Sequence, residues 1–253
     1  MKRKSVRKFK IEIPDDEIIE TLVRAGQRAP FASQLYSVIY SAEGNYAFGA
    51  PLWFVICIDV YKLERYMHLR DMKIKADDLT LLFLGIQDAS YMAENMVIAA
   101  ESLGLGSCFL GEGSINPSRV RQLTRLLRLP PRVLPAVELV MGFPDEDQPI
   151  RPRYPLEFTL FENGYPDLTD ADIIEAMSAM DEAFYNREPV LNPSQETDRV
   201  SETQKSFAMQ KNRWTEHVTR KWCQWAQSHE DLLEALTERG FHVVYPGEER
   251  AFD

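Results

Sequence analysis

The longest apolar stretch of the chain, Ile86–Glu112, combines a helical pattern with a strand and a glycine turn. Gln87, Glu94 and Glu101 are seven residues apart, so they form one narrow polar stripe on an otherwise apolar helix. Gly104 is expected to end the helix, because glycine adopts the left-handed backbone without strain. Apolar residues recur at the helical spacing of three and four, at Ile86, Ala89, Ala93, Met96, Ala100 and Leu103.

After this helix, Ser107–Leu110 is expected to form a short buried strand, and Gly111–Gly113 an irregular turn. A helix that leads into a strand and a glycine turn suits a flat ligand held against exposed backbone amides. The same pattern also fits a plain core helix followed by a flexible loop. This stretch by itself leaves both interpretations open.

Other apolar patterns predict a mixed α and β order. Ala50–Val60 and Val133–Gly142 are near-continuous apolar runs, typical of strands buried on both faces. Residues 187–206 are polar and contain prolines, which favours a mobile linker or lid. Helices are expected from Pro14, over Tyr61–Lys75, from Asn116–Pro117 and over Asp170–Asn186, with a β-rich segment at Tyr36–Tyr40 and an extended strand at Leu156–Phe161. An aromatic stripe on a last long helix favours a packing surface, for example against a second subunit, over a cofactor site; its members are Phe207, Trp214, Val218, Trp222 and Trp225.

Composition narrows the class of protein. The chain has 253 residues, 45% of them apolar, which is enough for a substantial globular core. Its net charge of −10 argues against a nucleic-acid partner or an acidic membrane surface. No apolar run is long enough to span a membrane, and the basic start is not followed by the apolar region of a secretory signal. Three unpaired cysteines favour the reducing cytoplasm, and four scattered histidines predict no metal site.

Two basic clusters stand out in this acidic chain. The first ten residues, MKRKSVRKFK, contain six lysines and arginines and no acidic residue. Arg151-Pro152-Arg153 forms the second cluster. One interpretation is a solvated tail. The other is a phosphate cradle, in which two guanidinium groups and the Ser5 hydroxyl bind one anion.

Four motifs in order resemble those of the FMN-dependent nitroreductase family, also described as NAD(P)H:flavin oxidoreductase-like. The first is Arg-x-Ser-x-Arg-x-Phe at Arg3–Phe9, and the second is the Ala-Pro segment at Ala29–Tyr36. The third combines Ala93–Met96 with Leu-Gly-Leu-Gly-Ser at Leu103–Ser107. The fourth is the basic, proline-containing segment Arg151–Pro155. Together they cover residues 1–165.

The resemblance implies an α+β fold, with a nitroreductase-like central mixed sheet flanked by helices, a long central helix and an extended C-terminal helical part. It also implies a domain-swapped homodimer with FMN at the subunit interface. Residues 1–165 would form the FMN-binding core, and residues 166–253 a C-terminal helical extension on the core or on the partner subunit. The ending, which includes Arg239-Gly240-Phe241, is similar to the flavin-reductase branch of the family.

The resemblance also implies a set of cofactor-binding residues and no catalytic residue, because the chemistry takes place at flavin N5. Pro30, Phe31, Ala32 and Gln34 would approach the ring and ribityl chain from the other subunit. Asp88 would lie near the site. The phosphate group would be bound by Arg3, Lys4, Ser5, Arg7, Arg151 and Arg153, and the N5 edge would face the backbone of Leu110, Gly111 and Glu112.

The implied activity is an FMN oxidoreductase that takes hydride from NAD(P)H and reduces nitroaromatic, quinone or flavin-type acceptors by a ping-pong mechanism. Phe31, Gln34 and Tyr36 depart from the serine, asparagine and glutamine of the family motif, which affects the expected substrate range. Two alternatives remain open. One is another flavin chemistry on the same fold: flavin fragmentation, dehalogenation or desaturation. The other is a flavin-carrying protein without turnover. We also expect a small-molecule electron acceptor, no nucleic-acid or membrane partner, and a cytoplasmic location.

Overall fold

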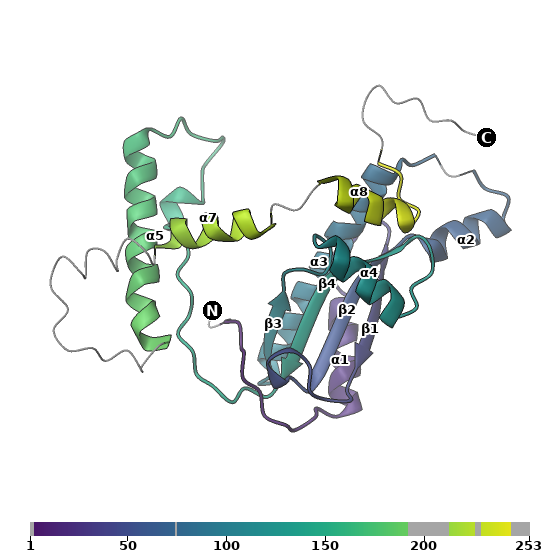
Figure 1. Cartoon of the computed structure of the whole chain (residues 1–253), viewed down its shortest axis with the longest axis horizontal. Helices are drawn as coiled ribbons and strands as arrows, with labels where there is room; N and C mark the ends of the chain where they lie inside the picture. Colours follow the sequence, from purple (N-terminus) through teal and green to yellow (C-terminus); the bar gives the residue numbers. More distant parts are fainter. Residues whose placement is uncertain (1–2, 74, 192–212, 226–228, 244–253) are drawn as a thin grey trace. The chain divides into compact units, whose positions relative to one another are not determined.

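The computed structural model describes residues 3–73, 75–191, 213–225 and 229–243 (Figure 1). The chain divides into two compact units. The core unit comprises residues 5–147 and 227–253, and the helical unit comprises residues 1–4 and 148–226. These units do not coincide with the two segments expected from the sequence, because a helix near the C-terminus belongs to the core unit.

A four-stranded sheet forms the centre of the core unit, in the order β1-β2-β4-β3. Every neighbouring pair of these strands is antiparallel. An isolated bridge between Ser5 and Ser107 is parallel, so the expected mixed character of the sheet resides in this bridge alone among the described residues. The two strands predicted as buried lie in the middle, and β2 is buried at every position. The strands are β1 (Tyr36–Ser41), β2 (Leu52–Asp59), β3 (Gly106–Leu110) and β4 (Val133–Gly142).

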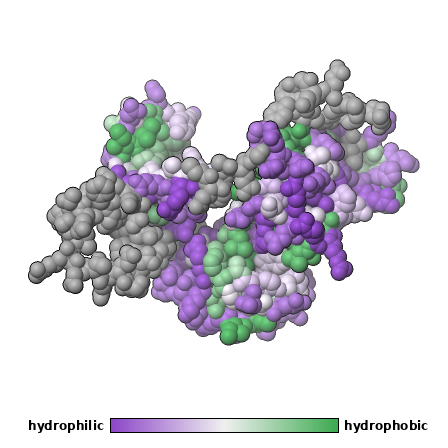
Figure 2. All heavy atoms as spheres, in the orientation of Figure 1, coloured by the Kyte–Doolittle hydropathy of each residue, from purple (hydrophilic) through white to green (hydrophobic). Residues whose placement is uncertain are grey.

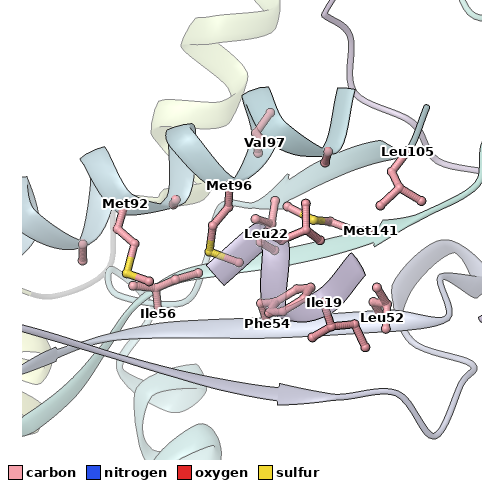
Figure 3. Close-up of a cluster of buried hydrophobic side chains, with 14 residues drawn as sticks. Ile19, Leu22, Leu52, Phe54, Ile56, Met92, Met96, Val97, Leu105 and Met141 are labelled. Atoms are coloured by element: carbon pink, nitrogen blue, oxygen red, sulfur yellow. The ribbon is translucent and has the colours of Figure 1, made fainter. Parts of the chain in front are cut away.

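One face of the sheet is covered by α1 (Asp16–Gly26) and α3 (Asp78–Ser102) (Figure 1). Strand side chains alternate between faces, so every second residue of β2 contributes to this layer. Figure 3 shows Leu22 of α1 with Met92 and Met96 of α3 above the sheet. The buried set in this view includes Leu52, Phe54, Ile56 and Met141 of the strands.

The opposite face is covered by α4 (Pro117–Leu126) and by the N-terminal segment. Val6 and Phe9 bury their side chains there, together with Trp53, Val55 and Cys57 of β2. Gly106 makes this close packing possible. A Cβ atom at Gly106 would lie 2.5 Å from Cγ2 of Val6, closer than two carbon atoms can approach.

Both ends of α3 carry residues suited to capping. The Asp77 side chain accepts hydrogen bonds from the backbone N–H of Thr80 at 2.9 Å and from its hydroxyl at 2.8 Å, which caps the helix. Gly104 has φ 77°, the left-handed conformation expected after a helix. Ile86 and Leu103, expected on the buried face, are exposed, because the buried arc is centred on Ala89, Ala93 and Met96.

Helix α8 (His229–Glu238) and the segment after it complete the core unit. Arg239 is buried and donates to the carbonyl oxygens of Leu129 at 3.0 Å and Val133 at 3.2 Å, and to that of Pro130. Phe241 is fully buried, and the Arg132 guanidinium lies 4.6 Å from the centre of its ring. These contacts attach residues 239–241 to the end of β4.

The helical unit contains η2 (Leu156–Phe158), α5 (Asp170–Leu191) and α7 (Trp214–Trp225). Trp214 packs on Phe184 with ring centroids 5.5 Å apart and donates to the Tyr154 hydroxyl at 3.2 Å. Trp214 of the aromatic stripe therefore packs within its own unit. Trp222 is exposed, whereas Phe207 and the Trp225 side chain lie outside the described part.

Several boundaries differ from the sequence expectation. The expected strand at Leu156–Phe161 is wrong, because Leu156–Phe158 forms a 3₁₀ turn. Helix α5 continues to Leu191, so the expected linker is helical over residues 187–191, and its remainder lies outside the described residues. Helix α2 (Tyr61–Leu69) ends before Lys75, and α7 is followed by α8 instead of being the last helix. In the described ranges, no helix is long and apolar enough to cross a membrane.

Candidate functional site

A pocket of about 440 Å³ opens in the core unit beside the end of β3. Its volume falls within the range of small-molecule sites, roughly 300–1,000 Å³. In Figure 2, hydrophobic surface lies around β3 and is bordered by hydrophilic surface over α4. The pocket brings together four residues that the sequence assigned to the cofactor, which are Arg7, Leu110, Gly111 and Glu112. The other lining residues are Phe48, Cys108, Phe109, Arg119, Gln122 and Glu138.

Arg7 reaches this pocket because the N-terminal segment is attached to the edge of the sheet. Val6 donates its N–H to the carbonyl oxygen of Ser107 at 2.9 Å, and the Arg7 N–H donates to Oε1 of Glu146 at 2.6 Å. Buried Val6 and exposed Arg7 alternate, as neighbouring residues of an extended chain do. The Arg7 guanidinium lies 5.8 Å from the ring centre of Phe48 on the pocket wall. The exposed Arg7 side chain therefore lies at the pocket, and hydrogen bonds hold the backbone that carries it.

The turn after β3 leaves free space at Gly111. A Cβ atom there would meet no atom of the described chain within 4 Å. The neighbouring Glu112 side chain is exposed, and its Oε2 accepts from Nδ2 of Asn116 at 3.4 Å. The Glu112 carbonyl oxygen accepts from the Asn116 N–H at 3.2 Å. Asn116, the residue that caps α4, therefore holds the turn from outside the pocket.

The pocket has an ionic wall that the sequence motifs do not indicate. Glu138 of β4 is only 2% exposed, and its carboxylate accepts from Nε1 of Trp53 at 3.0 Å and from Nε of Arg119 at 3.0 Å. A second contact joins Nη2 of Arg119 to Oε1 of Glu138. Arg119 also donates to Oε1 of Gln122 at 2.7 Å. One signal was present in the sequence: Glu138 is the charged residue inside the apolar run VLPAVELVMG.

The Ala-Pro loop and Asp88 also come together in the core unit. Asp88 of α3 is 1% exposed, and its carboxylate accepts from the backbone N–H groups of Ala32 at 2.7 Å, Ser33 at 3.1 Å and Leu35 at 2.9 Å. Phe31, Ala32, Ser33 and Gln34 are exposed, and so is Pro30. Asp88 therefore uses its carboxylate within the chain. Burial, with a smaller contribution from Asp88, raises the pKa of the Tyr36 phenol at the end of this loop.

The remaining predicted residues are divided between the two units. Ser5 and Arg7 belong to the core unit, whereas Arg3, Lys4, Arg151 and Arg153 belong to the helical unit. Arg153 donates from Nη1 to the carbonyl oxygens of Arg151 and Pro152, each at 3.0 Å. Their common binding of one phosphate stays a prediction.

Comparisons with known proteins agree with this architecture. The family model described as the nitroreductase family matches residues 1–53 and 40–143. The FMN reductase (NADPH) of Bacillus subtilis is 31% identical over 216 residues, covering 78% of this chain and 85% of that protein. A Cr(VI) reductase of Pseudomonas sp. strain G-1 is 31% identical over 185 residues, covering 67% of this chain and 75% of the relative.

Solved structures show the same fold. The NfrA1 nitroreductase from B. subtilis superposes with a TM-score of 0.79 at 24% identity, over 95% of this chain and 96% of that one. The NADPH:FMN oxidoreductase from Vibrio harveyi, solved in complex with NAD⁺, superposes with a TM-score of 0.70 at 26% identity, over 94% of both chains. The resemblance found in the four sequence motifs is therefore confirmed, and the chain belongs to the nitroreductase family.

Proposed function

We propose that this protein is an NAD(P)H-dependent FMN oxidoreductase that reduces small organic acceptors such as nitroaromatics, quinones or free flavin. Family membership supports the flavin, and the similarity to relatives named for NADPH and FMN supports the electron donor. The observation that carries the proposal is the pocket in which Arg7 and the Gly111 turn meet. These residues are far apart in sequence, and the family resemblance assigns them to one cofactor.

The pocket fits a flat anionic cofactor. The space at Gly111 admits a ring against the backbone, since no described atom would contact even an added Cβ there. Arg7 places a cation at the same pocket. The charge of the other arginine, Arg119, is balanced by buried Glu138. Arg7 is therefore suited to bind an anionic group, as arginine commonly does with phosphate.

Bound FMN would supply the redox chemistry, which is hydride transfer from NAD(P)H followed by reduction of the acceptor in ping-pong order. The chain binds and orients the reactants. The backbone N–H groups of Gly111 and Glu112 are assigned to stabilise negative charge at the ring edge, because fixed dipoles stabilise charge without reorganisation. Arg3, Ser5, Arg151 and Arg153 are assigned to the phosphate group.

The active form is proposed to be a homodimer with FMN between subunits. The outer face of α3 supports this assembly, because it carries large exposed apolar side chains beside the polar stripe. An apolar patch of this kind is typical of an interaction surface. Its members are Leu79, Phe83, Ile86, Tyr91 and Ile98.

Anaerobic titration tests the proposed function. The purified protein is expected to show the visible absorption of bound flavin, which bleaches on addition of NADPH or NADH and returns on addition of an acceptor. Each nucleotide is titrated separately, and the reduced protein is then mixed with nitroaromatic, quinone and flavin acceptors. Bound flavin that neither nucleotide reduces would refute the oxidoreductase and leave a flavin-carrying protein.

A further inference from the structure

Buried Asp88 holds the backbone of the loop between α1 and β1. Its carboxylate accepts three backbone N–H groups, those of Ala32, Ser33 and Leu35, at 2.7–3.1 Å. The loop turns sharply there, because Gln34 between the last two donors has φ 56°, a left-handed conformation that is uncommon for a residue other than glycine. One buried side chain thus determines the course of the loop backbone.

Burying this carboxylate is costly, because a charge loses its hydration in the interior. Among the described residues, Asp88 has these three backbone N–H donors and forms no ion pair with a lysine or arginine. Charge-assisted bonds from backbone N–H groups are stronger than neutral ones. Their geometry requires this loop conformation, so the hydrogen bonds to the Asp88 carboxylate favour it over other conformations of the segment.

The fixed loop does not serve the core of its own chain. Phe31, Ala32, Ser33 and Gln34 are all exposed, and only Leu35 at its end is buried. A strained and exposed backbone persists only where the surrounding structure holds it, and such sites commonly serve binding. The loop is therefore shaped for a partner outside this core.

We propose that Asp88 is a positioning residue, whose carboxylate preorganises the Pro30–Gln34 loop to receive the FMN ring without itself touching the cofactor. This inference rests on the proposed function, in which the loop approaches the flavin. It changes the role of Asp88 from a direct cofactor contact to a support of the residues that make the contact. Preorganisation raises affinity because the loop is not ordered at the moment of binding.

Asp88→Asn separates this role from a simple structural one. The asparagine amide has the same shape, but it has one carbonyl oxygen, and its NH₂ group cannot accept from a backbone N–H. We expect the FMN dissociation constant to rise about tenfold or more, which corresponds to the loss of about one hydrogen bond to a charged group. The visible circular dichroism of FMN, added back at saturation, should also change, because the ring is held differently.

Asp77→Asn is the matched control. It removes a carboxylate from the cap of the same helix, away from the loop, and asparagine caps helices as well as aspartate does. Wild-type FMN affinity and wild-type dichroism are expected for this variant. An Asp88→Asn protein with both properties unchanged would overturn the inference. A wild-type protein that binds no FMN would instead refute the proposed function.

Hydrogen exchange provides a test without any substitution. In the flavin-free wild-type protein, the amides of Ala32, Ser33 and Leu35 should exchange slowly, because Asp88 already holds them. Fast exchange of these amides before FMN is added would contradict preorganisation. In Asp88→Asn their protection should fall, whereas the amides of β2 should remain protected. Protection that is unchanged in Asp88→Asn would also overturn the inference.

Discussion

Partly exposed Arg119 of α4 and buried Glu138 of β4 form an ion pair on the wall of the candidate flavin pocket, with Nε of Arg119 3.0 Å from Oε2 of Glu138. The same carboxylate accepts from the Trp53 indole at 3.0 Å. The pair joins a helix to the centre of the sheet. Because Arg119 neutralises Glu138, the pocket does not present an unpaired buried negative charge to an anionic cofactor.

Arg119→Met should destabilise the protein by about 3 kcal/mol, because Glu138 would stay buried without its partner. The double variant Arg119→Met/Glu138→Gln should recover part of this loss, since glutamine is neutral and still accepts from Trp53. Urea unfolding of the single and double variants measures both free energies. Arg121→Met on the same helix, whose ion pairs to Glu234 and Glu238 are at the surface, should have little effect. A double variant no more stable than Arg119→Met would contradict this account.

Gly111→Val should leave folding intact and slow flavin reduction by roughly tenfold to a hundredfold, because a displaced ring is poorly oriented for hydride transfer. The fold tolerates the side chain, since no described atom is within 4 Å of the added Cβ. Gly164→Val is the control in a similarly open position. Glu112→Gln should have a smaller effect, because this side chain contacts Asn116. Stopped-flow reduction at equal FMN content decides the question, and a wild-type rate for Gly111→Val would place the reactive edge elsewhere.

Arg151→Ala/Arg153→Ala should release most of the FMN. Each charge-assisted contact contributes roughly 1.5–3 kcal/mol, so the loss of two lowers affinity by more than about a hundredfold. Arg24→Ala is the control, because this arginine pairs with Glu20 on the exposed face of α1. The flavin-to-protein ratio after gel filtration is the measurement. Full FMN occupancy in the double variant would show that these arginines do not bind the phosphate group.

The outer face of α3 should be an interface between subunits. Phe83 and Ile98 are 60% and 59% exposed in the single chain, and a glutamate at each position would place charge in a buried contact. Phe83→Glu/Ile98→Glu is expected to sediment as a monomer and to lose FMN. Leu126→Glu, at an exposed position on α4, should remain a dimer. A wild-type protein that is a flavin-loaded monomer at micromolar concentration would refute the dimer directly.

Cys57 should make stability fall at alkaline pH. Burial, with a contribution from Asp59, raises the pKa of its thiol to about 12 from an ordinary value of 9.0. The folded state therefore retains a proton that the unfolded chain loses above about pH 9, and the Cys57 contribution to stability decreases from there to about pH 12. At pH 10 the loss is about 1.4 kcal/mol. Urea unfolding at pH 8 and pH 10 should show this extra loss of stability in the wild type but not in Cys57→Ala. An equal decrease in the free energy of unfolding in both proteins would contradict the role of Cys57.

Local signals in the sequence determined much of the fold. The apolar runs predicted β2 and β4, and β4 coincides with the predicted Val133–Gly142. Gly104 predicted the end of α3, and Asn116-Pro117 the start of α4, because caps depend on residues a few positions apart. The motif order identified the family, since those motifs are read in sequence without knowing which strands pair.

Only the tertiary structure decided which distant groups meet. Glu138 and Trp53 are 85 residues apart, and the antiparallel register of β2 and β4 brings them together. Asp88 and Ala32 are 56 residues apart, and the packing of α3 brings the Asp88 carboxylate to the backbone of the loop. Trp214 packs on Phe184 because α5 and α7 lie against each other. The spacing of apolar residues along α7 could not specify that partner. Periodicity indicates which face of an element is buried, whereas the partner on that face depends on how the whole chain folds.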